Sequence, residues 1–395
     1  MIRVRKDILE NSYVGFLASS VNKKTRRPAF TAGADWQLRL DEGYYHIEGF
    51  FAGSHAMNRS MDRISGTAGK LQIAKAGGEH WTGYLSSDFT SKGYNINDIG
   101  FFRSPNDYGV VGQLSYKEEA AAEVVRRWGA SAFVHWRSNF DRAVLSRDLS
   151  LNGRMQLLNY WGGNVFAAGS AEAYDHFETR GNGLYKRHPA YSIGASMYSD
   201  ERNSLVGELS QSFSWNTQEY SNASTALELR YKPVTWADLE FEVEFSRRDN
   251  QEAWMTNITD ASGKKVSIFG DRSTREWDFT IRNTTMFTRD LSLQLYAQIF
   301  FAKGHYEHPR ALLDAHSFGA TTYNENHDFN EQAVNLNVVL RWEYLPGSAM
   351  YLVWTQARRG SLSDYYNPFS KDFSYAFDAP SYNVFLFKIS YWLNG

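Results

Sequence analysis

The sequence predicts an all-β fold: a transmembrane antiparallel up-and-down β-barrel of about 18 strands. Apolar and polar side chains alternate with a period of two, which is the spacing of a strand. We expect the strands of residues 236–301 to be longer than the roughly 5 to 6 residues of an ordinary strand and to reach the about 9 to 11 that cross a bilayer. Connections alternate between short and long, as in bacterial outer-membrane barrels. In the clearest run, Leu239, Phe241, Val243 and Phe245 alternate with Glu240, Glu242, Glu244 and Ser246.

The composition fits this class and excludes several others. The chain has 395 residues, only 8 prolines and no linker, so we expect a single domain over residues 1–395. The net charge of −2 argues against a nucleic-acid partner, and the absence of cysteine excludes disulfides and thiol nucleophiles. The mean hydropathy of −0.50 and the lack of a long uncharged apolar run exclude membrane-spanning helices. A β-barrel is compatible with this low mean hydropathy, because alternate residues of its strands are polar.

The strands follow one another along the whole chain. Gly43 permits a tight hairpin after the second run, and Pro233 stands at the end of the twelfth, where a missing N–H is tolerated. The eighteen runs are residues 12–20, 30–40, 44–53, 70–75, 81–87, 108–116, 130–137, 149–157, 164–177, 191–197, 208–214, 227–232, 239–246, 277–282, 292–299, 334–343, 350–357 and 385–393.

The connections predict which side of the membrane each end faces. Most connections after even-numbered strands are short, whereas residues 88–107, 303–331 and 359–381 form long connections after odd-numbered strands. We therefore expect short periplasmic turns and long extracellular loops. A barrel of this size is wide enough for an aqueous lumen. The alternative is a large soluble β-protein whose apolar rows face a dry interior.

Charged and amide side chains on the predicted inner face form the candidate site. Paired carboxylates are suited to acid–base chemistry, but lumen-lining charges balanced by arginine are the favoured interpretation, with an effect on solute preference. No nucleophile elbow, phosphate loop or dinucleotide fingerprint occurs, so we predict no enzyme and no catalytic residues. The predicted lumen-lining residues are Glu240, Glu242, Glu244, Asp278, Arg282, Asn335, Asn337, Arg341 and Glu343.

Two loops carry further candidates. Ile99, Phe101, Phe102 and Arg103 form an apolar patch in a polar loop, which either folds back to constrict the lumen or packs against the upper wall. Another loop holds metal-ligand residue types, but their spacing matches no zinc site, so we predict no metal and no cofactor. These residues are His305, His308, Asp314, His316 and His327.

Several segments together carry a family resemblance. They are residues 3–8 with 14–16, 96–103, 291–298, 351–356 and 385–392. These segments resemble a family of outer-membrane barrel domains of unknown function that usually follow a module like the family-nine carbohydrate-binding domain. The resemblance implies location and fold rather than chemistry, because the family has no established catalytic residues.

The expected function follows from fold and location. We expect an outer-membrane channel or transport-related protein for polar solutes, with the lipid bilayer as its surroundings. The alternative is a plugged barrel that serves as anchor or assembly partner for a periplasmic module, possibly a carbohydrate-binding one, or for another outer-membrane complex. Residues 1–8 lack the apolar core of a signal peptide, so we expect that a signal has been removed or that the chain is part of a longer protein.

Overall fold

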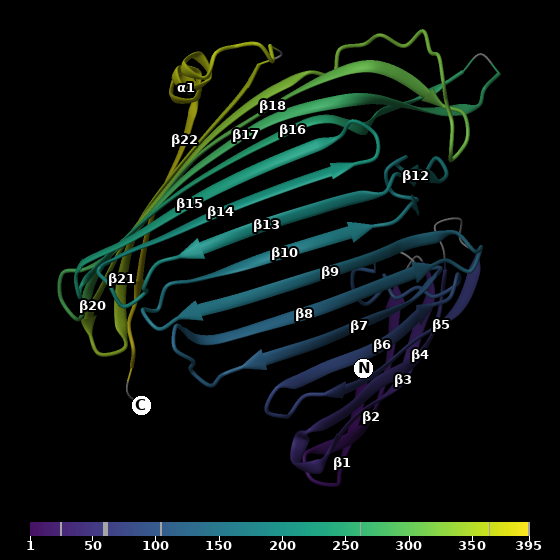
Figure 1. Ribbon diagram of the computed structural model, residues 1–395, viewed down its shortest axis with the longest axis horizontal. Helices are drawn as coiled ribbons and strands as arrows, with labels where there is room; N and C mark the ends of the chain where they lie inside the picture. Colours follow the sequence, from purple (N-terminus) through teal and green to yellow (C-terminus); the bar gives the residue numbers. More distant parts are fainter. Residues whose placement is uncertain (24–25, 58–61, 103–104, 261, 363, 394–395) are drawn as a thin grey trace. The chain divides into compact units, whose positions relative to one another are not determined.

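The computed structural model describes residues 1–23, 26–57, 62–102, 105–260, 262–362 and 364–393. The protein is all-β, with 70% of its residues in strands and 3% in helices, and it contains a large antiparallel sheet of 20 strands (Figure 1). None of the helices in these ranges has the length and apolar character needed to span a bilayer. The predicted all-β antiparallel class is therefore confirmed.

The first of two compact units comprises Met1–Met155, Phe166–Asp175 and Lys186–Tyr191. Each of its first eight strands pairs with the next in the chain, and a short 3-10 turn, η1 (Asp41–Gly43), joins the third to the fourth. These strands are β1 (Ile2–Ile8), β2 (Ser12–Lys23), β3 (Arg26–Leu40), β4 (Tyr45–Met57), β5 (Arg63–Lys75), β6 (Trp81–Thr90), β7 (Asp107–Glu118) and β8 (Val125–Ser138).

The second unit comprises Gln156–Val165, His176–Tyr185 and Ser192–Gly395. Its strands are β14 (Leu205–Asn216), β15 (Ser221–Val234), β16 (Ala237–Thr259), β17 (Lys265–Met286), β18 (Leu291–Leu312), β19 (Phe318–Gly319), β20 (Phe329–Leu345), β21 (Ser348–Leu362) and β22 (Ser381–Ser390). Residues of both units contribute to β9 (Val144–Leu157), β10 (Gly162–Ser170) and β13 (Ala190–Tyr198). A separate two-stranded sheet pairs β11 (Ala173–Asp175) with β12 (Tyr185–Arg187).

One face of the sheet in each unit is apolar and exposed. In unit 1, Ile73 and Leu85 lie opposite each other on β5 and β6 and are 53% and 59% exposed. In unit 2, Leu209 and Leu227 lie opposite each other on β14 and β15 and are 48% and 38% exposed. A soluble sandwich would bury such rows between its two sheets. These rows are therefore not the interior of a packed core.

The opposite face is polar and is crossed by ion pairs between neighbouring strands. Lys70 Nζ lies 3.2 Å from Glu48 Oε1, joining β5 to β4. The Arg137 guanidinium lies 2.7 Å from Asp107 and 2.5 Å from Asp88, joining β8 to β7 and β6. These pairs satisfy charges that strand alternation places together on one surface.

The buried core lies in the long ends of three strands. β16, β17 and β18 have 23, 22 and 22 residues, far more than a bilayer crossing needs, and extend past β14 and β15 (Figure 1). Ile268 and Phe269 of β17 are fully buried there. Ile268 packs with Met255 and Ala311. These ends therefore pack like a soluble β-protein, unlike the exposed rows below them.

The predicted strand number is wrong by two, because the main sheet has 20 strands rather than about 18. Each predicted run overlaps an observed strand. The additional strands are the seven-residue β1, in which Arg5, Lys6 and Asp7 are consecutive charged residues, and the two-residue β19. Among the described residues no closed barrel is found, so the barrel and its membrane placement stay predictions.

A helix, α1 (Phe369–Asp378), lies in the connection between β21 and β22 that we expected to be a long loop (Figure 1). Ala376 packs with Phe301 and Val334 on the apolar face of β18 and β20. The Asp372 carboxylate, 3% exposed, accepts a hydrogen bond of 2.8 Å from Asn330 Nδ2 and lies 3.5 Å from Lys303 Nζ. This buried polar contact fixes α1 on the sheet.

Replacing Asp372 by alanine should release α1. Asn330 and Lys303 would each lose a charged acceptor and keep only a backbone carbonyl, Asp364 O and Asn367 O, which costs about 1–3 kcal/mol. Trypsin should then cut after Lys371 faster than in the parent protein, and the melting temperature should fall. Asp378→Ala, at the exposed end of the same helix, is the control. Equal cleavage rates in the two variants would contradict this role of Asp372.

Candidate functional site

Carboxylates of adjacent strands form a row on the polar face of unit 2. The register sets Glu208 of β14 opposite Glu228 of β15, and Glu228 opposite Glu242 of β16. On β16 and β17 it sets Glu244 opposite Asp278. Like charges directly opposite each other across strands are unfavourable, so this arrangement requires nearby cations or water. The row extends the acidic cluster that the sequence predicts.

Arg282 is the central cation of this row. It lies opposite Glu240, and its guanidinium bonds to the Glu240 carboxylate and lies 3.3 Å from Glu242. Its other side faces the Tyr296 ring at 5.7 Å. Asp278 is held by neutral donors, Thr280 Oγ1 at 2.9 Å and Gln298 Nε2 at 2.6 Å. The predicted residues on β16 and β17 are thus brought together, with carboxylates in excess.

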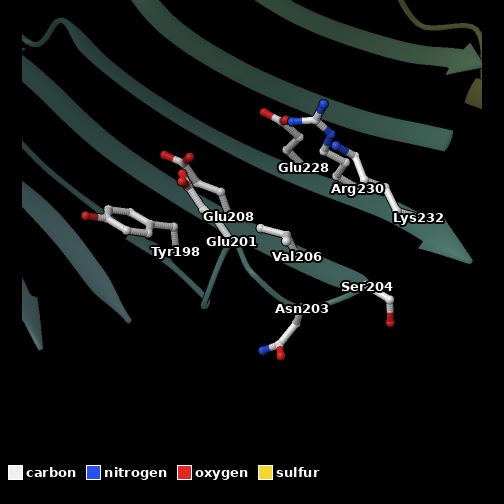
Figure 2. Close-up of a pocket in the computed structure, with 9 residues that line it drawn as sticks. All are labelled: Tyr198, Glu201, Asn203, Ser204, Val206, Glu208, Glu228, Arg230 and Lys232. Atoms are coloured by element: carbon white, nitrogen blue, oxygen red, sulfur yellow. The ribbon is translucent and has the colours of Figure 1, made fainter. Parts of the chain in front are cut away.

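The row continues into a pocket of about 240 Å³ at the turn between β13 and β14 (Figure 2). Its lining residues are Tyr198, Glu201, Asn203, Ser204, Val206, Glu208, Glu228, Arg230 and Lys232. Arg230 and Lys232 reach the Asp238 carboxylate at 2.9 and 3.3 Å. In the same turn, the Arg202 guanidinium holds the pKa of Asp200 below its usual range. The pocket presents both signs of charge to a polar ligand.

Sequence reasoning missed most of this pocket. Glu228, Arg230 and Lys232 alternate with Leu227, Leu229 and Tyr231 in the predicted twelfth strand, so their face was readable from the sequence. The sequence does not predict which residues lie opposite them on the neighbouring strands, because these pairings depend on strand register. The turn at residues 235–236 joins β15 to β16 and brings Arg230 opposite Glu240.

The other predicted lumen residues divide into two groups. Asn335 lies opposite Gln298, and Asn337 lies opposite Tyr296, so both extend the polar row onto β20. Arg341 and Glu343 bond to each other at 2.5 Å, near the turn to β21. Glu343 also accepts a hydrogen bond from the Gly347 backbone N–H at 3.1 Å. This second pair therefore stabilises a turn and is separate from the acidic cluster.

The loop with the predicted constriction folds onto the polar face of β4 and β5. Asn95 N donates to Ser54 Oγ at 2.9 Å, and Tyr94, only 7% exposed, packs edge-on against Phe102. Ile99 and Phe101 stay exposed, and Arg103 lies outside the described residues. The loop thus contacts Ser54 of β4 and Gly66 of β5, and whether it constricts a lumen or only packs against the wall stays a prediction.

A contact between two loops holds this segment in place. The Asp141 carboxylate bonds to Lys92 and accepts a hydrogen bond of 2.9 Å from Asn106 Nδ2. These two bonds hold the pKa of Asp141 below its usual range. Residues 91–102 are therefore attached both to the sheet and to the connection after β8.

The predicted loop of residues 303–331 is wrong in its first part, because β18 continues to Leu312 and carries His305 and His308. Within the described ranges, no group of three or more metal-ligating side chains converges on these histidines. His305 Nδ1 bonds to Asp328 at 2.7 Å, and His308 Nδ1 bonds to Asp271 at 3.1 Å. His327 bonds to the Tyr323 hydroxyl at 2.6 Å. Each imidazole has its own partner.

Comparison with known protein families identifies the family of this chain. A family model described as "Domain of unknown function (DUF5916)" covers residues 2–394. The chain belongs to this family. The predicted resemblance to an unknown-function family is thereby confirmed, while the carbohydrate-binding module expected before the domain stays a prediction. No curated protein matches the chain.

Adding a side chain at Gly66 should detach the loop of residues 91–102 from the sheet. A Cβ on Gly66 would lie 2.0 Å from Tyr94 N, whereas one on Gly53, in the neighbouring strand, would meet nothing closer than 3.9 Å. Gly66→Ala should destabilise the contact by about 1–3 kcal/mol and expose Lys92 to trypsin. Gly53→Ala should leave cleavage unchanged. Similar cleavage in both variants would refute the packing role of Gly66.

Proposed function

We propose that this domain is a transmembrane β-barrel of the bacterial outer membrane whose polar face lines an aqueous passage for polar solutes. The observation that carries the proposal is the exposed apolar face of the strands. Rows such as Ile73 with Leu85, and Leu209 with Leu227, need an apolar surrounding, and hydrocarbon supplies it.

The charges on the polar face support a passage for solutes rather than a packed interior. Glu208, Glu228 and Glu242 lie in adjacent strands, with Arg282 as their nearest neutralising group on β17. Such a row is stable in contact with water, because hydration lowers the repulsion between carboxylates. An excess of carboxylates in a pore favours cations over anions. The proposed passage is therefore weakly cation-selective.

A second function is supported by the loop of residues 91–102. This loop packs on the polar face of β4 and β5 at Ser54 and Gly66, where a plug could begin. The domain would then anchor a periplasmic module or another outer-membrane protein instead of conducting solutes. Single-channel recording after insertion into planar bilayers separates the two: a steady open current supports the passage, and a closed membrane supports the anchor.

Placement in a membrane is tested by two adjacent residues of β14. Leu209→Arg would put a charge on the apolar face, at a cost of about 2–4 kcal/mol near the bilayer midplane. Ser210→Arg would put the same charge on the polar face and should change stability by no more than about 0.5 kcal/mol. Urea titration of folding into lipid vesicles measures both. Equal effects, or a parent chain that stays soluble without detergent, would refute the proposal.

Selectivity is tested at Arg282. Arg282→Gln removes the cation between Glu240 and Glu242 and should raise the cation-to-anion permeability ratio. The expected increase is about two- to fivefold, since the Coulomb change near water is on the order of 0.5–1 kcal/mol. Reversal potentials in a salt gradient give this ratio. Arg289→Gln, in the exposed turn between β17 and β18, is the control. An unchanged ratio in Arg282→Gln would place this row outside the conducting path.

A further inference from the structure

Two rows of side chains lie next to each other on the apolar face of unit 2. The first row is aromatic: Phe245, Trp277 and Phe301 lie opposite one another on β16, β17 and β18. Two residues further along each strand, the second row is cationic and consists of Arg247, Arg275 and Lys303. The apolar band of these strands therefore ends in the aromatic row, and the cationic row follows it.

Helix α1 covers the junction of the two rows. The Phe369 ring lies 5.8 Å from the Trp277 ring and 5.1 Å from the Phe301 ring, measured between centroids. Phe369, Phe373 and Phe377 are four residues apart and are each 42–43% exposed, so they form one apolar stripe along the helix. Arg358 Nη1 donates to the carbonyl oxygens of Phe377 and Ala379 and fixes the helix end.

A pocket of about 220 Å³ opens between the helix and the sheet. Its residues are Phe245, Arg275, Trp277, Phe301, Lys303, Asn330, Phe369 and Asp372. One part of its wall is aromatic, and the other part holds the Arg275 guanidinium and the Lys303 ammonium group. The pocket thus joins an apolar surface to two positive charges, with the Asp372 carboxylate beside Lys303.

Positive charge is in excess around this pocket. Asp249 neutralises Arg247 and Arg275, both at 2.7 Å, and Asp372 lies 3.5 Å from Lys303. Three cations in direct register thus face two carboxylates. Like charges opposite each other across strands are unfavourable, and a bound anion relieves that repulsion. Arginine and lysine both bind phosphate well, arginine through its planar fork.

We propose that this pocket binds a phosphorylated lipid of the surrounding membrane, with the phosphate at Arg275 and Lys303 and an acyl chain along Phe245 and Trp277. Free phosphate would make no contact with the aromatic wall, and a neutral lipid would leave the cations without a counterion. Aromatic side chains also gather where hydrocarbon meets headgroups. α1 then lies in that interface with its phenylalanine stripe toward the acyl chains. This inference rests on the proposed membrane placement.

The test uses the full chain in bilayer nanodiscs of phosphatidylcholine with a minor fraction of phosphatidic acid. Native mass spectrometry after removal of bulk lipid counts retained lipids. The parent protein should retain phosphatidic acid in preference to phosphatidylcholine. The double variant Arg275→Gln/Lys303→Gln should lose at least about tenfold of that preference, since a charge-assisted contact exceeds the 1.4 kcal/mol that equals a factor of ten.

The matched control removes an arginine and a lysine from exposed turns outside both pockets, as Arg289→Gln/Lys264→Gln, and should keep the preference. Equal retention of both lipids by the parent, or the same loss in the control, would overturn the inference. Displacement of phosphatidic acid by millimolar inorganic phosphate would also overturn it, because the site would then recognise the ion alone. Flotation with vesicles separates the two proposals. A chain that fails to float refutes both, whereas a floating chain without lipid preference refutes only this one.

Discussion

The structure depends on one constraint: neighbouring strands satisfy each other's backbone hydrogen bonds, so side chains alone decide what each face of the sheet can contact. Alternation sends Leu209 and Leu227 to one face and Glu208 and Glu228 to the other. Burying the first face would need a partner layer of matching area. Because these apolar rows are exposed, the surroundings of the strands must supply that layer, which is the reason for the bilayer placement that we propose.

The same strands behave differently along their length. Near the short turns, β16 and β17 carry exposed apolar rows and a charged polar face. Beyond Phe245 and Trp277, cations replace apolar residues, and further on Ile268 and Phe269 are buried as in a water-soluble protein. The apolar face thus changes character within one continuous ladder, as the proposed membrane placement requires. Helix α1 lies where the two parts of the strands meet. Its phenylalanine stripe adjoins the aromatic row, and Asp372 contacts Lys303 and Asn330.

The polar face is organised by register more than by composition. Arg282 contacts Glu240 and Glu242 because the connection from Thr259 to Lys265, together with two register shifts, sets how β17 pairs with β16. A shift of a single residue would move these charges to the apolar face. Such a shift would bring apolar side chains to the polar face and charges to the apolar face. This free-energy cost maintains the row and the pocket beside Tyr198.

Strand positions and the composition of each face were determined by the sequence alone, since a period of two needs no tertiary information: each of the eighteen runs overlaps a strand. The sequence pattern does not predict β1, because its charged residues interrupt the alternation. It does not predict α1 either, because ten residues in a long connection show too little helical periodicity by themselves. Tertiary structure decided which rows lie opposite each other, how Gly66 meets Tyr94, and that Asp372 holds α1 on the sheet. These contacts join residues far apart in the chain, and only register and loop packing fix their distances.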